Sequence, residues 1–199
     1  MNSVDRAKCD RLRELARCRV AFVWAGYRQP EDYGYDFRDL VSPYSRTAGN
    51  VDAAVMVVLQ DWASHDVLSR EPINAEMVRY GHDPRRPTNK RLKALLTKHL
   101  NVALKDTYGT NLFPFIKYGG MSAAIPMQDL VQVARVFAVP QIAIVQPRLV
   151  LALGRKTAEA LRRAGATVAE LPHPAARISR EAMNAAWRRM AVEYQGAAA

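Results

Sequence analysis

Residues 55–61 read Val-Met-Val-Val-Leu-Gln-Asp, a continuous apolar run that ends on two polar side chains. Five apolar residues in succession suit a strand that is buried on both faces, as the strands of a parallel sheet are. Further candidate strands follow at residues 107–115, 149–153 and 167–171. We therefore expect four strands that lie side by side in one sheet.

Segments with helical spacing separate these strands. One expected helix is capped by Thr88, one begins at Pro126 and is kinked or split by Pro140, and a basic helix spans residues 155–164. A last helix follows the cap residue Ser179. Strands that alternate with helices predict an α/β fold, a three-layer α/β/α sandwich around a central four-stranded parallel sheet, in a single domain over residues 1–199.

The first 50 residues differ in pattern from the rest of the chain. We expect a helix at residues 3–18 and then an ordered loop arm at residues 26–50, whose aromatic side chains pack on the core rather than on nucleic acid. Residues 61–87 are expected to form a polar loop, and residues 196–199 a frayed end.

The charge balance points to a polyanionic partner. The chain carries 29 Lys and Arg against 19 Asp and Glu, which gives a net charge of +10. Such an excess suits nucleic acid, or less often an anionic membrane, but it can also serve solubility alone. Composition leaves these alternatives open.

Cysteine usage and hydropathy narrow the class of protein. Cys9 and Cys18 are too few for a disulfide scaffold or for a four-cysteine metal or iron–sulfur site, so we expect reduced thiols in a cytoplasmic protein. We find no run of about 18 apolar residues and expect no membrane span. The charged N-terminus lacks the apolar core of a secretion signal.

The candidate site lies where the strands end, because ligands of parallel α/β sheets bind beyond the carboxyl ends of the strands. Asp61 could position water or stabilise a cation, or serve as a turn residue. Asn111 could pair with the edge of a nucleobase, or bond nearby backbone. His173, held between Pro172 and Pro174, could donate to an oxygen where charge develops, or be structural.

Two further segments are candidates for phosphate contacts. Gly119 and Gly120 allow the backbone to approach a phosphate, with charge from Lys117, although an ordinary glycine turn is the better explanation of the motif when it is taken alone. Arg155 and Lys156 begin a helix directly after a strand, where the helix end and both cations favour an anion. By contrast, His82 and His99 are expected to be surface groups.

Four of these segments occur in an order that resembles a known family. Residues 57–61 resemble the first strand and water-activating motif of uracil-DNA glycosylases. Thr110-Asn111, residues 147–154 and residues 171–174 resemble the Thr-Asn strand end, the Pro-hydrophobic-Gly strand and the His-Pro-Ser motif of that family. The likeness covers roughly residues 55–177.

The resemblance implies roles for the strand-end residues. It implies a base that is flipped out of the nucleic acid and read in a pocket. Asp61 would orient water or stabilise the sugar cation, Asn111 would bond the uracil edge, and His173 would stabilise the departing uracil anion. Gln60, Trp62 and Phe113 would bind the base together with Asn111.

The sequence also departs from the family pattern. The Pro-Phe whose ring stacks on uracil is replaced by Pro87-Thr88, so stacking would come from Trp62, Phe113 or Tyr80. The loop that enters the DNA would contain Ala175 and Arg177, and Ala175 replaces a serine that contacts a phosphate in the family. The cluster cysteines of the iron–sulfur branch are missing, and the chemistry needs no metal or other cofactor.

The sequence thus predicts a monomeric enzyme that acts on DNA and removes uracil or a related damaged base. Two other functions remain open. One is a nucleic-acid-binding module without catalysis on the same fold, because a fold does not fix a function. The other is an enzyme of free nucleosides or nucleotides, against which the net charge of +10 argues.

Overall fold

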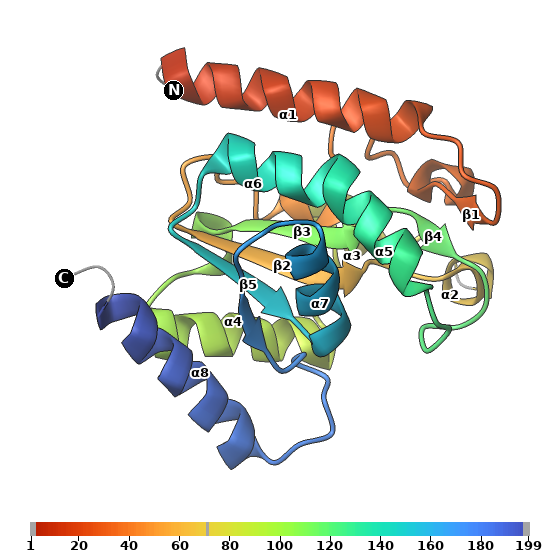
Figure 1. The fold of residues 1–199 in the computed structure, drawn as a ribbon. Coiled ribbons are helices and arrows are strands. Elements are labelled where there is room, and N and C mark those ends of the chain that lie inside the picture. The colour runs from red at the N-terminus through yellow and green to blue at the C-terminus, as the bar shows by residue number, and fades with distance from the viewer. Residues whose placement is uncertain (1–2, 71, 197–199) are drawn as a thin grey trace.

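The computed structural model describes residues 3–70 and 72–196 (Figure 1), so most of the expected frayed end lies outside the described residues. Its centre is a parallel sheet in the order β3-β2-β5-β6. The strands are β2 (Val55–Asp61), β3 (Tyr108–Phe113), β5 (Leu149–Leu153) and β6 (Ala169–Leu171). The prediction of a four-stranded parallel sheet is confirmed.

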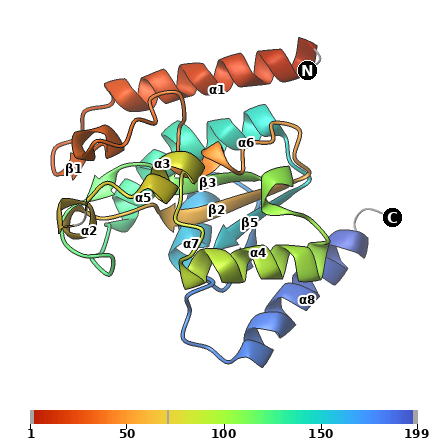
Figure 2. The ribbon, with the colours of Figure 1, turned by 180° about the vertical axis from the view of Figure 1, so that it is seen from behind.

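One face of the sheet is covered by α4 (Pro87–Leu100) and α8 (Arg180–Gly196), which lie below the strands in Figures 1 and 2. Successive side chains of a strand point to opposite faces. Val55, Val57 and Leu59 of β2 therefore point to this face, where they pack in one buried cluster with apolar residues of both helices.

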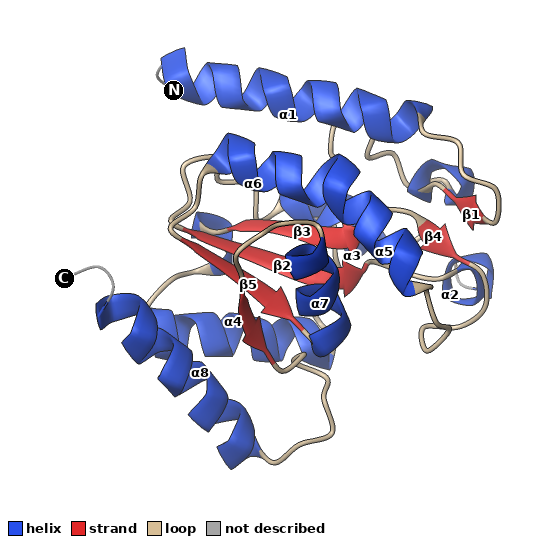
Figure 3. Cartoon of the chain, in the orientation of Figure 1, coloured by secondary structure: helices blue, strands red, loops and turns tan. Residues whose placement is uncertain are grey.

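The opposite face is covered by the helices that follow β3 and β5 (Figure 3). Met56 and Val58 of β2 point to this face and share a buried cluster with α7 (Arg155–Arg163) and with the helical segment before β5. α1 (Ser3–Ala21) lies outside that segment, so the helices form layers on both sides of the sheet. This arrangement is a three-layer α/β/α fold.

The helical segment before β5 has three parts. These are α5 (Met127–Val133), the π-helical turn η4 (Ala134–Ala138) and α6 (Val139–Val145). The wide turn comes directly before Pro140, whose ring cannot fit against the preceding turn of a regular α-helix. The predicted split is confirmed.

This same segment, Met127–Val145, is long and apolar enough to span a membrane by length and composition, which the sequence analysis did not anticipate. Core helices of soluble proteins pass the same test. In the structure the apolar side of the segment is buried against the sheet through residues such as Leu130, Val133 and Phe137.

The N-terminal arm is ordered by a buried ion pair. Arg19, at the end of α1, is fully buried, and its guanidinium bonds both carboxylate oxygens of Glu31 at 2.7 and 2.9 Å. It also donates to the backbone carbonyls of Phe37 and Leu40. The arm contains the short strand β1 (Tyr27–Arg28) and two 3-10 helices, η1 (Pro30–Tyr33) and η2 (Pro43–Arg46). The prediction of a packed arm is confirmed.

Several expected boundaries are wrong. The segment expected to be a polar loop contains α2 (His65–Arg70) and α3 (Ala75–Tyr80). α4 is preceded by Arg86 as its cap and starts with Pro87, so Thr88 lies inside its first turn. Proline suits that first position because its φ is fixed and it has no N–H to satisfy. A 3-10 turn, η3 (Leu104–Asp106), leads into β3.

Candidate functional site

A small cavity of about 120 Å³ lies at the carboxyl edge of the sheet. Asp61 at the end of β2, Asn111 in β3 and His173 just after β6 all line it. The first turn of α4 forms another part of the wall through Thr88 and Asn89. The structure therefore brings together the acid, the amide and the imidazole that the sequence singled out.

The carboxylate of Asp61 is held from two sides. Lys117 Nζ lies 2.9 Å from Asp61 Oδ2, and the side chains of Lys117 and Asp61 are only 3% and 9% exposed. Gln60 Nε2 donates to Asp61 Oδ1 at 3.0 Å. Lys117 also donates to the carbonyl of Met121 at 2.7 Å. The negative charge of Asp61 is thus fixed in direction and partly compensated.

Lys117 reaches Asp61 because its strand is folded back onto the arm. β4 (Ile116–Lys117) pairs antiparallel with β1, which places Lys117 opposite Tyr27. Its backbone also bridges to Ser64, just after β2. The expectation that Lys117 contacts a DNA phosphate is wrong, because this ammonium is buried and paired. Gln60 donates to Asp61 and is not among the residues that line the cavity, so its expected contact with the base stays a prediction.

The amide of Asn111 is oriented by Ser42. Ser42 Oγ donates to Asn111 Oδ1 at 2.8 Å and accepts from the backbone N–H of Asn111 at 3.1 Å. Asn111 is only 2% exposed, and no described residue accepts a hydrogen bond from its Nδ2. A fixed amide with a free donor in a cavity wall is suited to a polar planar ligand.

The imidazole of His173 is held as a hydrogen-bond donor. The backbone N–H of Ala175 donates to Nδ1 at 3.1 Å, so in the neutral ring Nε2 carries the hydrogen. Burial lowers the pKa of His173 below its ordinary value of 6.5, although the nearby charge of Asp61 partly opposes this. Arg91 Nη1 donates to the carbonyl of Pro174 at 2.7 Å and ties this loop to α4.

Trp62 lines the cavity with a ring that is fixed in place. Its Nε1 donates to the carbonyl of Gly81 at 2.8 Å. The ring also makes edge-on contacts with Tyr35 and Phe37, with centroid distances of 5.2 and 5.6 Å. Of the three rings proposed for stacking, only Trp62 lines this cavity.

Phe113 lies elsewhere, and its assignment to the base site is wrong. It is fully buried in the core, where its ring packs against Tyr27 at a centroid distance of 4.7 Å and against Phe115 at 5.7 Å. β3 ends at this residue, and the N-terminal arm covers its ring. An alternating pattern along the strand could not reveal this cover.

His82 and Tyr44 are cavity residues that the sequence analysis missed. His82 is 3% exposed, not a surface group, and its ring stacks on Tyr44 at a centroid distance of 4.8 Å. Its Nδ1 donates to the carbonyl of Tyr80 at 3.1 Å. Burial lowers the pKa of His82 to about 4, so the ring is neutral near pH 7.

A local signal for His82 exists in the sequence. Asn74 caps α3 by accepting from two backbone N–H groups, and Gly81 ends the helix with φ at 72°. A side chain at Gly81 would collide with the carbonyl of Pro43, so glycine is required there. An Asn and a Gly at helix-cap spacing would have predicted α3 and placed His82 directly after it.

The other expected DNA contacts are at the surface or in turns. Arg155 and Lys156 are exposed in the first turn of α7, and Arg177 is exposed in the loop before α8, as is Ala175. Gly119 has a positive φ of 79°, and its carbonyl accepts from the N–H of Asp66.

Gly120 continues this turn beside α2, and its carbonyl accepts from the N–H of Ala123 at 2.9 Å. The two glycines thus form a turn with backbone partners of its own. That these segments contact phosphate stays a prediction.

Among residues 3–70 and 72–196 no cluster of three or more His, Cys, Asp or Glu side chains is arranged to hold a metal ion. Cys9 and Cys18 are free thiols on α1. Comparison of the chain with protein-family models and with curated protein sequences gives no match.

Proposed function

We propose that this protein is a DNA glycosylase of the uracil-DNA glycosylase superfamily, which hydrolyses the N-glycosidic bond of uracil or a related damaged base. One observation carries the proposal: Asp61, Asn111 and His173, from three stretches far apart in the chain, line a single cavity. The cavity lies where α/β sheets bind their ligands, beyond the carboxyl ends of parallel strands.

The size of the cavity supports a base as the ligand. Its volume of about 120 Å³ is well below the ~300 Å³ at which pockets for drug-sized molecules begin. A single ring fits such a space, whereas the sugar and phosphates of a nucleotide remain outside. This is the arrangement that a base extruded from a strand requires, and it weighs against an enzyme of free nucleotides.

The side chains can share the chemistry of base release. The Nε2–H of His173 would donate to a carbonyl oxygen of the base, where negative charge develops as the bond to the sugar breaks. Asp61 would accept a proton from the attacking water and stabilise the positive sugar. Asn111 would hold the polar edge of the base, with the rings of Trp62 and Tyr44 as walls.

One observation favours a second candidate, a nucleic-acid-binding protein without catalysis. The ammonium of Lys117, 2.9 Å from the carboxylate of Asp61, already compensates its charge. A compensated carboxylate stabilises a sugar cation less than a free one does, because the two positive charges compete for it. The same cavity would then hold an extruded base without cleaving it.

An assay of base release separates the two candidates. The protein is incubated with uracil-containing single-stranded and duplex oligonucleotides, and alkali then cleaves any abasic sites. We expect strand breaks with the wild type and losses of roughly 10²–10³-fold for Asp61→Asn and His173→Ala. Asp10→Asn, at an exposed position of α1, is the matched control and should keep full activity. Full activity in both cavity variants would contradict the site, whereas binding without breaks would support the second candidate.

A further inference from the structure

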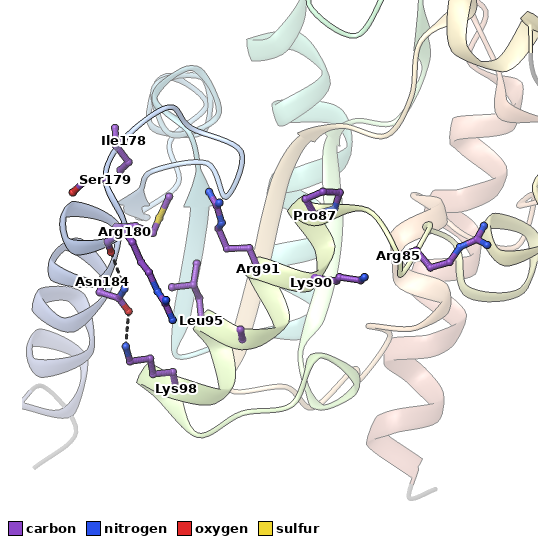
Figure 4. A pocket seen from close by; sticks show the side chains of 12 residues that line it. Arg85, Pro87, Lys90, Arg91, Leu95, Lys98, Ile178, Ser179, Arg180 and Asn184 are labelled. Carbon is purple, nitrogen blue, oxygen red and sulfur yellow. Dashed lines mark hydrogen bonds between the residues drawn. The ribbon is translucent and has the colours of Figure 1, made fainter.

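A second, larger hollow lies between α4 and α8, and its volume is about 600 Å³. Figure 4 shows side chains of the two helices facing one another across it, with Lys98 bonded to Asn184. We call it the α4–α8 groove. Five of its twelve lining residues are exposed cations, and none of the twelve is Asp or Glu. The cations are Arg85, Lys90, Arg91, Lys98 and Arg180.

These cations are poorly compensated. Among the described residues only Arg85 of the five forms an ion pair with a carboxylate, that of Asp83 at 3.4 Å. Arg91, Lys98 and Arg180 point toward the space between the two helices, whereas Lys90 and Arg85 point away from α8 (Figure 4). Like charges that meet in one groove repel each other unless an anion lies between them. The charge of the groove is therefore complementary to a polyanion.

The floor of the groove indicates which part of a polyanion it suits. It is apolar, with Leu95 and Met183, and it contains no aromatic ring on which a base could stack. Contacts would thus go to phosphates, which carry no sequence information. A hollow of this volume admits a short stretch of single strand, whereas the width of a duplex exceeds the space between two packed helices.

The groove shares a wall with the small cavity. Along the start of α4, Thr88 and Asn89 line the cavity, whereas Pro87 and Lys90 line the groove. Arg91 lines the groove and also bonds the carbonyl of Pro174, next to His173. A strand whose base occupied the cavity would have its neighbouring phosphates near the start of α4, where the groove begins.

We infer that the α4–α8 groove binds the phosphate backbone of the single strand that flanks the base in the cavity. This assignment rests on the proposed function, and it names the surface that supplies affinity. Because the contacts are to phosphate, binding through the groove is independent of base sequence and weakens with salt.

The first test measures the salt dependence of binding to a short, labelled thymidine oligonucleotide. The groove variant is Lys98→Gln with Arg180→Gln, and the matched control is Arg11→Gln with Arg17→Gln on α1, across the sheet from the groove. Each lost single-strand phosphate contact lowers the slope of log K against log salt by about 0.7. We expect the slope to fall by ~1.4 in the groove variant and to stay unchanged in the control.

The second test measures which flank of the base matters. Affinity is compared for oligonucleotides that carry uracil near the 5′ or the 3′ end. We expect added nucleotides to strengthen binding from one flank only, and the groove variant to lose that gain. Equal gains from both flanks, or a gain that the variant keeps, would overturn the assignment.

The outcomes separate this inference from the proposed function. An unchanged salt slope in the groove variant, with base release intact in the wild type, overturns the groove alone. A reduced slope in a protein that releases no base supports the groove and contradicts the glycosylase. Tighter binding to vesicles of anionic phospholipid than to the oligonucleotide, lost in the same variant, would overturn the groove as a nucleic-acid site.

Discussion

The small cavity and the α4–α8 groove share the first turn of α4 but treat charge in opposite ways. At the wall of the cavity, Asp61 is paired with Lys117 at 2.9 Å, and their side chains are only 9% and 3% exposed. In the groove, Lys98 and Arg180 are exposed and form no ion pair with a described carboxylate. A buried charge must be paired, because removal from water costs several kcal/mol, whereas an exposed cation stays hydrated until an anion arrives.

This difference suggests that the two regions contribute differently to binding. Fixed donors and acceptors in a small cavity select a ligand, because a partner that leaves one of them unpaired is penalised. Solvated cations along a groove attract any polyanion, with little selection. On this view the cavity decides which base is held, and the groove decides how tightly the strand is held.

The largest effect expected is a loss of stability, and it appears when two variants are compared, each of which lacks one positive charge, at the cavity or in the groove. Lys117→Met leaves the carboxylate of Asp61 buried without its partner, which should lower the free energy of unfolding by ~3–5 kcal/mol. For a chain of this length that corresponds to a fall in Tm of about 10 °C. Lys98→Met, in the groove, should change the stability by less than ~0.5 kcal/mol. Urea unfolding of both variants measures the contrast.

A double variant guards against a trivial loss of packing. Lys117→Met combined with Asp61→Asn removes both charges, and it should recover part of the lost stability because no unpaired charge remains. Equal losses of stability in Lys117→Met and Lys98→Met, or no recovery of stability in the double variant, would show that the cavity and the groove do not differ in the way we describe.

The fold follows from the sequence more fully than the site does. The apolar run of β2 predicts a strand buried on both faces, because helices cover both faces of a parallel sheet. Periodicity does not predict α2 or α3, because each has only six residues and one buried side chain, Leu68 or Met77, and only the caps of α3, Asn74 and Gly81, mark a helix. Helices this short are stabilised by tertiary packing and carry little periodic signal.

The site follows from the sequence only where strand ends define it. Asp61, Asn111 and His173 are found because parallel strands bring their carboxyl ends to one edge. The partner of Asp61 is not, because Lys117 reaches it through the antiparallel pairing of β4 with β1, which no local pattern encodes. His82 is buried by a loop contact with Tyr44, so no alternation marks it.

A somewhat smaller effect on stability is expected from a change of pH, and it concerns the cavity alone, because it arises from the buried His82. The pKa of His82 is lowered to about 4, mainly by burial, from its ordinary value of 6.5. Between these values the unfolded chain binds more protons than the folded one, so stability falls as pH falls from 6.5 to 4. The full difference amounts to ~3 kcal/mol.

Unfolding by urea at several pH values tests this expectation. His82→Asn can keep a donor to the carbonyl of Tyr80 but cannot titrate, so its stability should depend less on pH in the same window. Arg180→Gln, a change in the groove, should leave the pH dependence of the wild type in place. A wild-type stability that is flat between pH 4 and 6.5 would contradict the burial of a neutral His82.

The smallest effect expected is a shift in the pKa of His173, which tests whether His173 and Asp61 interact electrostatically. Burial lowers the pKa of His173, and the carboxylate of Asp61 opposes that shift. Asp61→Asn removes the opposing charge, so the pKa of His173 should fall further below 6.5 and its ring should stay neutral to lower pH. Lys98→Gln alters only a solvated charge in the groove, whose influence is screened by salt, and should leave the titration unmoved. NMR titration of the His173 ring in the wild type, Asp61→Asn and Lys98→Gln measures both effects.

If the pKa of His173 were unchanged or raised in Asp61→Asn, the carboxylate and the imidazole would not share one cavity in solution, and the difference between the two regions would lose its physical basis.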